Sequence, residues 1–417
     1  MRQPVSIRGR LFSSLHIVDY RRLWFFDLFA AAGNSMEQLA QGWLVLTITD
    51  SPFWVGAVLG IRGIGQICFS PLGGVIADRF NRVRILQVSH ILRIAMLMAL
   101  GFLIYSDQIE LWHCIVLAVS QGLLQAWVTP STKSLAFDLV GAKRLLNALA
   151  ALHGASDIAR LVGSILVGFL ITFAGMGVAY FVISAFFAAS LIPLSFVRAK
   201  SAAQKNTGQS FFANLKAGVQ YAGGHKTIRR VLLFTVLIEA FGFGHQVMLP
   251  VIARDYLEVG ATGLGFLNAA AGLGGVIGIV LLGVAGDVRA KGILLLGLGV
   301  GVGVSVILFG LSDWFALSLV LSGVLRAGLV TYDSTLNATL ILLAVDSLRG
   351  RILGLVSVAY GFTSVGGFAY GIVASLYNAP LALALGGGVI IAAWAGLMLP
   401  IQTLRKPSMF ESEISGK

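Results

Sequence analysis

The sequence predicts an all-α membrane protein whose twelve transmembrane helices form two pseudo-symmetric six-helix halves. The chain of 417 residues is 57% hydrophobic and only 12% charged, whereas soluble domains carry about 25% charged residues. Its apolar runs divide into twelve stretches, each near the roughly 20 residues that a helix needs to cross a bilayer. A pattern of glycines and acidic residues in the first half of the chain returns in the second half.

This internal repeat rests on four residue pairs that share one fixed offset along the chain. The pairs are Gly56 and Gly265, Gly65 and Gly274, Gly74 and Gly283, and Asp78 and Asp287. Self-similarity at a fixed offset is typical of a duplicated architecture. We therefore expect two related halves.

Hydrophobic periodicity and length give the twelve expected spans. They are 24–48, 52–77, 85–106, 111–135, 146–173, 176–197, 229–253, 261–286, 292–312, 314–343, 352–377 and 380–403. The corresponding domains are an N-terminal arm (1–23), a first six-helix half (24–197), a linker (198–228), a second six-helix half (229–403) and a tail (404–417). An even number of spans places both ends of the chain on one side of the membrane.

The linker over 198–228 is the one long polar stretch. Its first part, Arg198–Gln209, is rich in Lys, Ala, Gln and Asn and is typical of a flexible connection. Phe211, Leu215 and Val219 follow at helical spacing, which predicts an amphipathic helix along the membrane surface. A regulatory or partner-binding segment is the alternative interpretation.

The net charge of +12 could indicate a nucleic-acid partner, but the positions of the basic residues exclude it. Most of the 30 Lys and Arg fall in the terminal segments and in every second loop, while the loops near Asp50, Asp107–Glu110 and Asp313 have none. This is the positive-inside pattern, which predicts that both termini are cytoplasmic. The basic balance therefore reports topology, and the expected partner is the lipid bilayer.

No enzyme or cofactor motif stands in the chain. Cys68 and Cys114 both lie inside apolar runs, which leaves neither a disulfide framework nor a metal spacing. The glycines of Gly299–Gly303 lie inside an apolar span with no preceding strand, so they do not form a dinucleotide fingerprint. A phosphate-binding Gly-Lys-Ser/Thr loop is missing too, and the polar, basic start predicts an uncleaved first helix.

A charged hinge between the second and third spans is the first candidate functional element. It runs from Gly73 to Arg84 and holds Asp78 beside Arg79 and Arg82. If odd-numbered spans run outward, Asp78 ends the second span, where the helix dipole disfavours an anion. Asp78 therefore needs cationic partners. A solvated charge cluster that only sets topology is the alternative.

Ionisable side chains inside the spans are functional candidates because burial in lipid costs several kcal/mol. The acids are Asp27, Glu37, Asp157, Glu239 and Asp333; the bases are Arg62, Arg93, Arg160 and Arg326, with His90, His153 and His245 able to titrate. Three sets share a helix face by spacing. These sets are His153, Asp157 and Arg160; Arg326, Asp333 and Asn337; and Asp27, Asn34 and Gln41. Such faces predict a polar cavity between the halves, with the first two sets as its candidate lining.

The same residues suggest which acid binds a proton. A carboxylate beside an arginine resists protonation, whereas an isolated buried carboxylate accepts a proton more readily. Glu37 and Glu239 have no basic neighbour on their own spans, so they are the first proton-carrier candidates, followed by Asp27. An arginine reaching across from another helix would reverse this interpretation.

Several motifs together carry a family resemblance. They are the hinge Gly73–Arg84, Asp19–Trp24, Gly42–Leu46, Asp50–Pro52, Leu249–Arg254 and Arg349–Arg351. In these motifs the chain resembles the major facilitator superfamily, in the branch with bacterial enterobactin exporters and macrolide efflux pumps. The resemblance covers nearly the whole chain.

The resemblance implies a secondary active transporter in the bacterial inner membrane that exports a small amphipathic, siderophore-like molecule by proton antiport and alternating access. It implies a monomer without cofactors, driven by the proton gradient, and a conformational latch made of Gly74, Asp78, Arg79 and Arg82. Ser164 and Val167 stand where family antiporters carry proline and glycine, which weakens the argument for antiport. A multidrug or macrolide pump, an uptake permease and a non-transporting sensor are the alternatives.

Overall fold

The structure is a computed structural model that describes residues 14–141, 144–198, 219–285, 291–343, 349–398 and 401. These residues are almost entirely helical, and no strand occurs among them. The predicted all-α fold class is therefore confirmed. The amphipathic helix expected in the linker falls largely outside the described residues, as does Asp287 of the second hinge.

The first half of the chain contains six long helices. They are α2 (Val18–Thr49), α3 (Pro52–Arg79), α4 (Arg82–Tyr105), α5 (Leu111–Val140), α6 (Leu145–Phe173) and α7 (Met176–Ser195). Local signals set several of their ends. The Asn81 side chain accepts hydrogen bonds from the Val83 and Arg84 amides and begins α4, while Glu110 and His113 form a capping box at the start of α5.

The second half is less regular. It contains α9 (Lys226–Leu237), the π-helix η2 (Ile238–Phe243), the 3₁₀ helix η3 (Gly244–Met248), α10 (Leu249–Val251), the π-helix η4 (Ile252–Tyr256), α11 (Gly260–Ala285), α12 (Lys291–Gly310), α13 (Phe315–Leu343), α14 (Arg349–Tyr360), α15 (Phe362–Leu376), α16 (Ala379–Ala393) and the π-helix η6 (Trp394–Met398). The seventh expected span is thus one continuous run of changing helix type. The eleventh is divided at Gly361 into α14 and α15.

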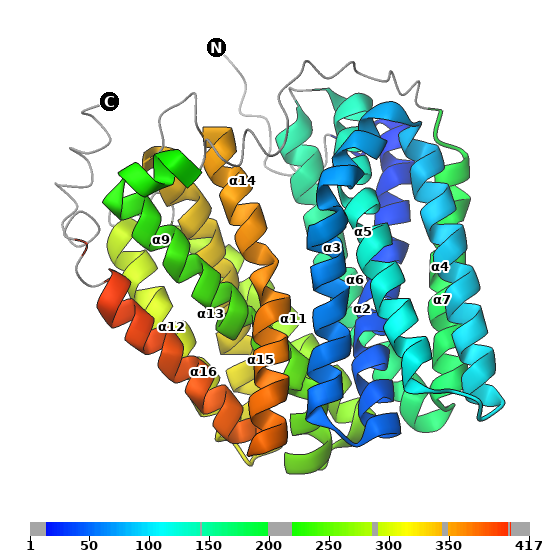
Figure 1. The fold of residues 1–417 in the computed structure, drawn as a ribbon. Helices are drawn as coiled ribbons and strands as arrows, with labels where there is room; N and C mark the ends of the chain where they lie inside the picture. Colours follow the sequence, from blue (N-terminus) through cyan, green and yellow to red (C-terminus); the bar gives the residue numbers. More distant parts are fainter. Residues whose placement is uncertain are drawn as a thin grey trace. The chain divides into compact units, whose positions relative to one another are not determined.

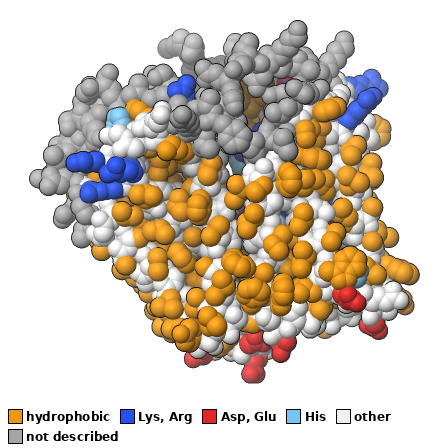
Figure 2. Space-filling view, viewed as in Figure 1, with side chains coloured by type: hydrophobic (Ala, Val, Ile, Leu, Met, Phe, Trp, Pro, Cys, Tyr) orange, Lys and Arg blue, Asp and Glu red, His pale blue; other side chains and the backbone are white. Residues whose placement is uncertain are grey.

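Eleven of the helical segments among the described residues are long and apolar enough to cross a membrane. The remaining expected span corresponds to α2, which is 32 residues long but carries charged residues such as Asp27 and Glu37. Its length suffices for a bilayer at 1.5 Å per residue. The exposed fractions of Phe173 (78%) and Leu281 (62%) are typical of side chains that face lipid. Figure 2 shows hydrophobic side chains across the visible face, with acidic ones gathered at its lower edge.

The chain divides into two compact units, and each takes segments from both halves of the sequence. Unit 1 is built from the described residues of Met1–Leu44, Gly65–Thr207 and Ala261–Ala269, and unit 2 from those of Val45–Ile64, Gly208–Gly260 and Ala270–Lys417. Unit 2 therefore includes the turn between α2 and α3, and unit 1 includes the first part of α11. The sequence-based domain boundaries remain a prediction.

In unit 1, α4 lies beside α7 and also packs against α5 (Figure 1). An apolar cluster in unit 1 joins five helices through buried side chains. These side chains include Tyr20, Leu23 and Phe26 of α2, Leu86 of α4, Leu135 of α5, Leu152 of α6 and Leu194 of α7. The Tyr20 hydroxyl donates to the Ala148 carbonyl at 2.6 Å, which satisfies its polar end inside the cluster.

In unit 2, α12 lies beside α16 and against α13, and α15 packs on η2 and η3 (Figure 1). Several glycines of unit 2 lie where helix backbones approach closely. A Cβ at Gly274 would overlap the backbone of Gly323, and one at Gly366 would overlap the carbonyl of Ala240. Small residues let these backbones approach closely, because lipid provides no hydrophobic drive for helix association. The approach of α15 to η2 brings Thr363 of α15 within hydrogen-bond distance of Glu239 in η2.

Candidate functional site

A buried charge pair lies in unit 1 between α2 and α4. Arg93 donates to Glu37 Oε2 through Nε at 2.7 Å and also through Nη2, and Gln121 of α5 donates to Glu37 Oε1. The Glu37 side chain is fully buried. The Arg93 guanidinium also lies over the Phe187 ring, 4.3 Å from its centroid. This pair is a cross-link among α2, α4, α5 and α7.

The pair weakens the argument for Glu37 as a proton carrier. Glu37 has no basic neighbour on its own span, but Arg93 reaches it from another helix, which is the case named above that would reverse the interpretation. The sequence lists both residues but does not show that α2 and α4 bring them together. Neutralising one partner of a buried pair leaves the other charge uncompensated, so protonation of Glu37 would leave the charge of Arg93 without its partner.

The other polar residues predicted on α2 contact neighbouring helices in unit 1. Asp27 accepts a hydrogen bond from Ser156 of α6 at 2.8 Å. Gln41 is fully buried and donates to the Cys114 carbonyl of α5 at 3.3 Å. The side-chain oxygen of Asn34 is buried without a hydrogen-bond partner among the described atoms. The polar stripe therefore holds helices together over at least part of its length.

The predicted stripe on the fifth span lies on α6. His153 and Arg160 are exposed and Asp157 is partly buried. The Arg160 carbonyl accepts a hydrogen bond from Ser35 of α2 at 3.0 Å.

Part of the charged hinge lies outside the described side chains. Gly74, Asp78 and Arg79 belong to the last turns of α3, and nothing further is described of them. Arg82 begins α4, is 4% exposed and forms an ion pair with Asp138 of α5. Asp138 was not among the predicted site residues, because its position near the end of an apolar run gives no signal that it would meet the hinge.

In unit 2 a second polar cluster surrounds Glu239. This residue lies in η2, is 4% exposed and accepts a hydrogen bond from the Thr363 hydroxyl of α15 at 2.9 Å. Arg326 and Asp333 of α13 are near enough to act on Glu239 electrostatically. π-Helical turns within α-helices are rare and often mark functional sites. Both the helix type and the burial of an acid single out Glu239.

Asp333 is the second acid of this cluster. Its Oδ1 accepts hydrogen bonds from the Tyr360 hydroxyl at 2.7 Å and from Asn337 Nδ2 at 3.2 Å. Asn337 also lies 3.2 Å from the Tyr360 hydroxyl, which closes a three-residue network. Arg326 lies over the Phe243 ring of η2, 5.2 Å from its centroid. The structure thus brings together four sequence-predicted residues, Glu239, Arg326, Asp333 and Asn337.

The hydroxyls of Tyr360 and Thr363 were not predicted as partners of these acids. Tyr360 and Thr363 lie inside an apolar span, which gives no signal that their hydroxyls would meet the acids. Their role depends on the interruption of the helix at Gly361, which the sequence does not locate.

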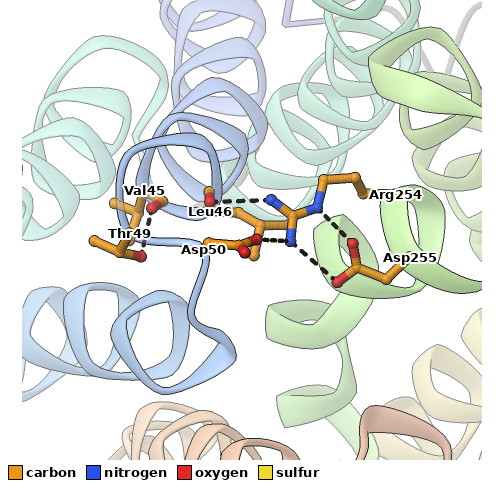
Figure 3. A network of polar contacts seen from close by, with 6 residues as sticks. All are labelled: Val45, Leu46, Thr49, Asp50, Arg254 and Asp255. Atoms are coloured by element: carbon orange, nitrogen blue, oxygen red, sulfur yellow. Dashed lines mark hydrogen bonds and ion pairs between the residues drawn. The ribbon is translucent and has the colours of Figure 1, made fainter.

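Figure 3 shows a third polar network, around Arg254 in unit 2. Arg254 Nη2 donates to Asp50 Oδ1 at 2.5 Å, Nε donates to Asp255 Oδ1 at 2.5 Å, and Nη1 donates to the Leu46 carbonyl at 3.1 Å. Leu46 lies in the last turn of α2, where the helix dipole favours a cation. The guanidinium therefore joins the α2–α3 turn of the first half to η4 of the second half.

Among the described residues, no group of three or more His, Cys, Asp or Glu could hold a metal ion. The networks around Glu37 and Glu239 have in common a buried acid between apolar, membrane-spanning helices. Buried acids in such helices are a property of membrane transport proteins. The fold and these sites define a multi-pass membrane transporter.

Residues 10–413 match the family of transmembrane secretion effectors. The chain belongs to this family and to the major facilitator superfamily, which confirms the resemblance noted from the sequence motifs. This membership makes it a membrane-embedded transporter of small molecules.

Two curated relatives are similar along much of the chain. The staphyloferrin A transporter of Staphylococcus aureus (strain NCTC 8325 / PS 47) is 24% identical over 258 residues, which cover 60% of this chain and 63% of that protein. A protein named as a bacilysin exporter, BacE, of Bacillus subtilis (strain 168) is 27% identical over 376 residues, covering 87% of this chain and 89% of its own.

Solved structures support the fold. The nucleoside transporter NupG matches with a TM-score of 0.73 at 12% identity, covering 94% of this chain and 99% of that one. A bacterial homologue of the human lysosomal transporter Spinster, in an inward-facing and occupied conformation, matches with a TM-score of 0.64 at 15% identity, covering 95% and 94%. At these identities the likeness concerns the fold alone.

Proposed function

We propose that this protein exports a small amphipathic, siderophore-like molecule across the bacterial inner membrane by proton antiport. The observation that carries the proposal is the match of residues 10–413 to secretion effectors. The names of the relatives, a staphyloferrin A transporter and a bacilysin exporter, support export of a small molecule. In this proposal the protein works as a monomer without cofactors and takes its energy from the proton gradient.

Glu239 is the proposed proton carrier. It is buried in a π-helical turn, and its hydrogen-bond partner is the neutral hydroxyl of Thr363. Desolvation penalises the charged form of a carboxyl group, so a buried acid held by a hydroxyl can change its protonation during a transport cycle. Glu37 is a weaker proposal because Arg93 compensates its charge. Asp27, held by Ser156, remains a second candidate.

The candidate substrate contacts of each unit by itself are Arg326, Asp333 and Asn337 in unit 2, and His153, Asp157 and Arg160 in unit 1. These side chains combine both signs of charge with amide and imidazole groups. An amphipathic molecule with carboxylate and hydroxyl groups would find complementary partners among them. Nearby aromatic rings such as Phe243 supply apolar surface.

Alternating access is proposed to use one charged contact at each end of the helices. The charged hinge, with Gly74, Asp78, Arg79 and Arg82, is the proposed latch on the cytoplasmic side, where both termini are proposed to lie. The Arg254 network is the proposed clamp on the other side, because it holds the α2–α3 turn against η4 (Figure 3). In this proposal the latch and the clamp must each break once in every transport cycle.

The test uses purified protein reconstituted into vesicles with staphyloferrin A as the probe. We expect the probe to accumulate in vesicles whose interior is acidic, since protons then leave as the probe enters through protein in the inverted orientation. Glu239→Gln, which keeps the shape but cannot titrate, should abolish this dependence on the gradient. Accumulation that ignores the proton gradient in the wild type would contradict antiport.

The runner-up functions give different results in the same vesicles. A multidrug pump would transport erythromycin in preference to staphyloferrin A. An uptake permease would accumulate the probe with the opposite gradient. A sensor on the same scaffold would bind without moving any probe.

A further inference from the structure

The junction between α14 and α15 carries two hydroxyl side chains, one on either side of Gly361. Tyr360 ends α14 and Thr363 lies in the first turn of α15. Each hydroxyl donates to a different acid from a different helix: Tyr360 to Asp333 of α13, and Thr363 to Glu239 of η2. One short segment therefore contacts both acids of unit 2.

The junction is a place where regular α-helical bonding is interrupted. The Gly361 amide donates to the Val358 carbonyl at 3.1 Å, and the Ser364 amide donates to the Gly361 carbonyl at 3.2 Å. Both bonds span three residues instead of four. Tightened turns of this kind within a long helical run often mark hinges, so rotation here would move the Thr363 hydroxyl relative to the Tyr360 hydroxyl.

Close backbone packing holds Thr363 within reach of Glu239. A Cβ at Gly366 would overlap the Ala240 carbonyl, and one at Gly244 would lie 3.2 Å from the Gly366 carbonyl carbon. The absence of these side chains lets α15 approach η2 and η3. A small displacement of α15 from η2 would consequently break the bond between Thr363 and Glu239.

The charged and polar groups that act on the two acids come from α13, α14 and α15. The groups that act on Glu239 and Asp333 are Arg326, Tyr332 and Asn337 of α13, and Tyr360 of α14. Helices α15 and α16, which pack against η2, carry no charged residue within their bounds. The hydroxyls at the junction are thus the groups that α15 and the end of α14 supply to the acids.

We propose that Tyr360 and Thr363 are positioning residues that stabilise the charged forms of Asp333 and Glu239, and that movement at the Gly361 junction, where α14 and α15 meet, withdraws a hydroxyl from its acid. Proton uptake by the two acids is thereby linked to this junction. The inference rests on the proposed proton-coupled export. It adds the residues and the element that connect the protonation of the acids to conformation.

The test measures the pH midpoint of transport in vesicles for Thr363→Val and Tyr360→Phe. A hydrogen bond to the charged form of a carboxyl favours that form. Its loss should move the midpoint toward higher pH, by about one pH unit, as expected for one charge-assisted bond. Thr363→Ser, which keeps the hydroxyl, should restore the wild-type midpoint.

Tyr370→Phe and Ser375→Ala are the matched controls. Tyr370 donates to the Phe241 carbonyl at 2.7 Å, and Ser375 donates to the Ile372 carbonyl of its own helix at 2.8 Å. Each control variant removes a hydroxyl of α15 that does not contact an acid, so the pH midpoint of its transport should stay at the wild-type value. An equal shift in Tyr370→Phe and Thr363→Val would overturn the inference.

A second measurement separates this inference from the proposed function. Infrared titration of the protonated carboxyl band in detergent needs no transport, and Glu239→Gln and Asp333→Asn assign the bands. We expect the Glu239 band to titrate at higher pH in Thr363→Val, or in Thr363→Ala if valine prevents folding. An unchanged band rejects the inference even if export is confirmed, whereas a shifted band without export rejects only the proposed function.

Discussion

At the scale of single residues, the two buried glutamates have opposite environments. Glu37 is surrounded by Arg93 and Gln121, whereas the hydrogen-bond partner of Glu239 is the hydroxyl of Thr363. From the sequence they were equivalent, since neither has a basic residue nearby on its own helix. Their partners come from other helices, and sequence periodicity reports only the residues of one helix.

The pairing of Glu37 predicts a stability effect for Arg93→Met. Removing one partner of a buried ion pair costs about 3–5 kcal/mol, so this variant should lose most of its thermal stability in detergent. The double variant Glu37→Met with Arg93→Met should be clearly more stable than Arg93→Met, because no unpaired charge remains. Melting followed by tryptophan fluorescence checks this, and equal stability of Arg93→Met and the wild type would contradict the cross-link.

At the scale of elements, the irregular helices of the second half position the site. The π-helix η2 carries Glu239, and the junction at Gly361 carries its partner. The apolar runs of the sequence predict the two spans that contain Glu239 and Thr363, because long apolar runs are a strong signal. The same runs predict a regular helix in each span, so the π-helix η2 and the junction at Gly361 are not predicted.

The close approach of α15 to η2 predicts that Gly366→Ala is destabilising. A Cβ there would overlap the Ala240 carbonyl, and such overpacking costs about 1–3 kcal/mol. Gly388→Ala in α16 is the control, because a Cβ at Gly388 meets nothing within 4 Å and alanine favours a helix by about 1 kcal/mol. Size-exclusion profiles after heating should separate the two variants, and equal survival would show that α15 can shift freely.

The Arg254 network predicts a modest shift between conformations. Asp50 is 84% exposed, and exposed ion pairs contribute about 0–1 kcal/mol, so Arg254→Gln should change the population of the clamped state by up to about fivefold. Arg254→Lys should lie between wild type and Gln because it keeps the charge but loses the forked geometry. Spin labels at Ser51→Cys and Leu257→Cys, in a background without Cys68 and Cys114, report the distance across the clamp.

The control for this experiment is Asp107→Asn, in the turn between α4 and α5. Asp107 has a φ of 54° and Asp50 a φ of 48°, so both adopt the left-handed conformation of a turn. The Asp107→Asn substitution therefore removes a comparable loop charge in unit 1. Its distance distribution should match that of the unsubstituted protein. A distribution unaffected by Arg254→Gln would rule out the clamp.

At the scale of the whole molecule, composition and charge predict the topology. Twelve spans and the positive-inside pattern predict that both termini lie on the cytoplasmic side. Cysteines placed one at a time in the N-terminal arm and in the tail, in a cysteine-free background, should both be protected from a membrane-impermeant thiol reagent in intact cells. Labelling of one end but not the other would contradict the even number of spans.

The sequence by itself determined the fold class, the approximate limits of the spans and the superfamily, because these follow from apolar length, charge distribution and local motifs. It also identified most of the ionisable residues at the sites. Only the tertiary structure decided which of them are paired: Glu37 with Arg93, Arg82 with Asp138, Glu239 with Thr363 and Arg254 with Asp50. The physical reason is that the charge state of a buried group depends on atoms a few ångströms away, and in a helical bundle those atoms come from helices that are distant in the chain.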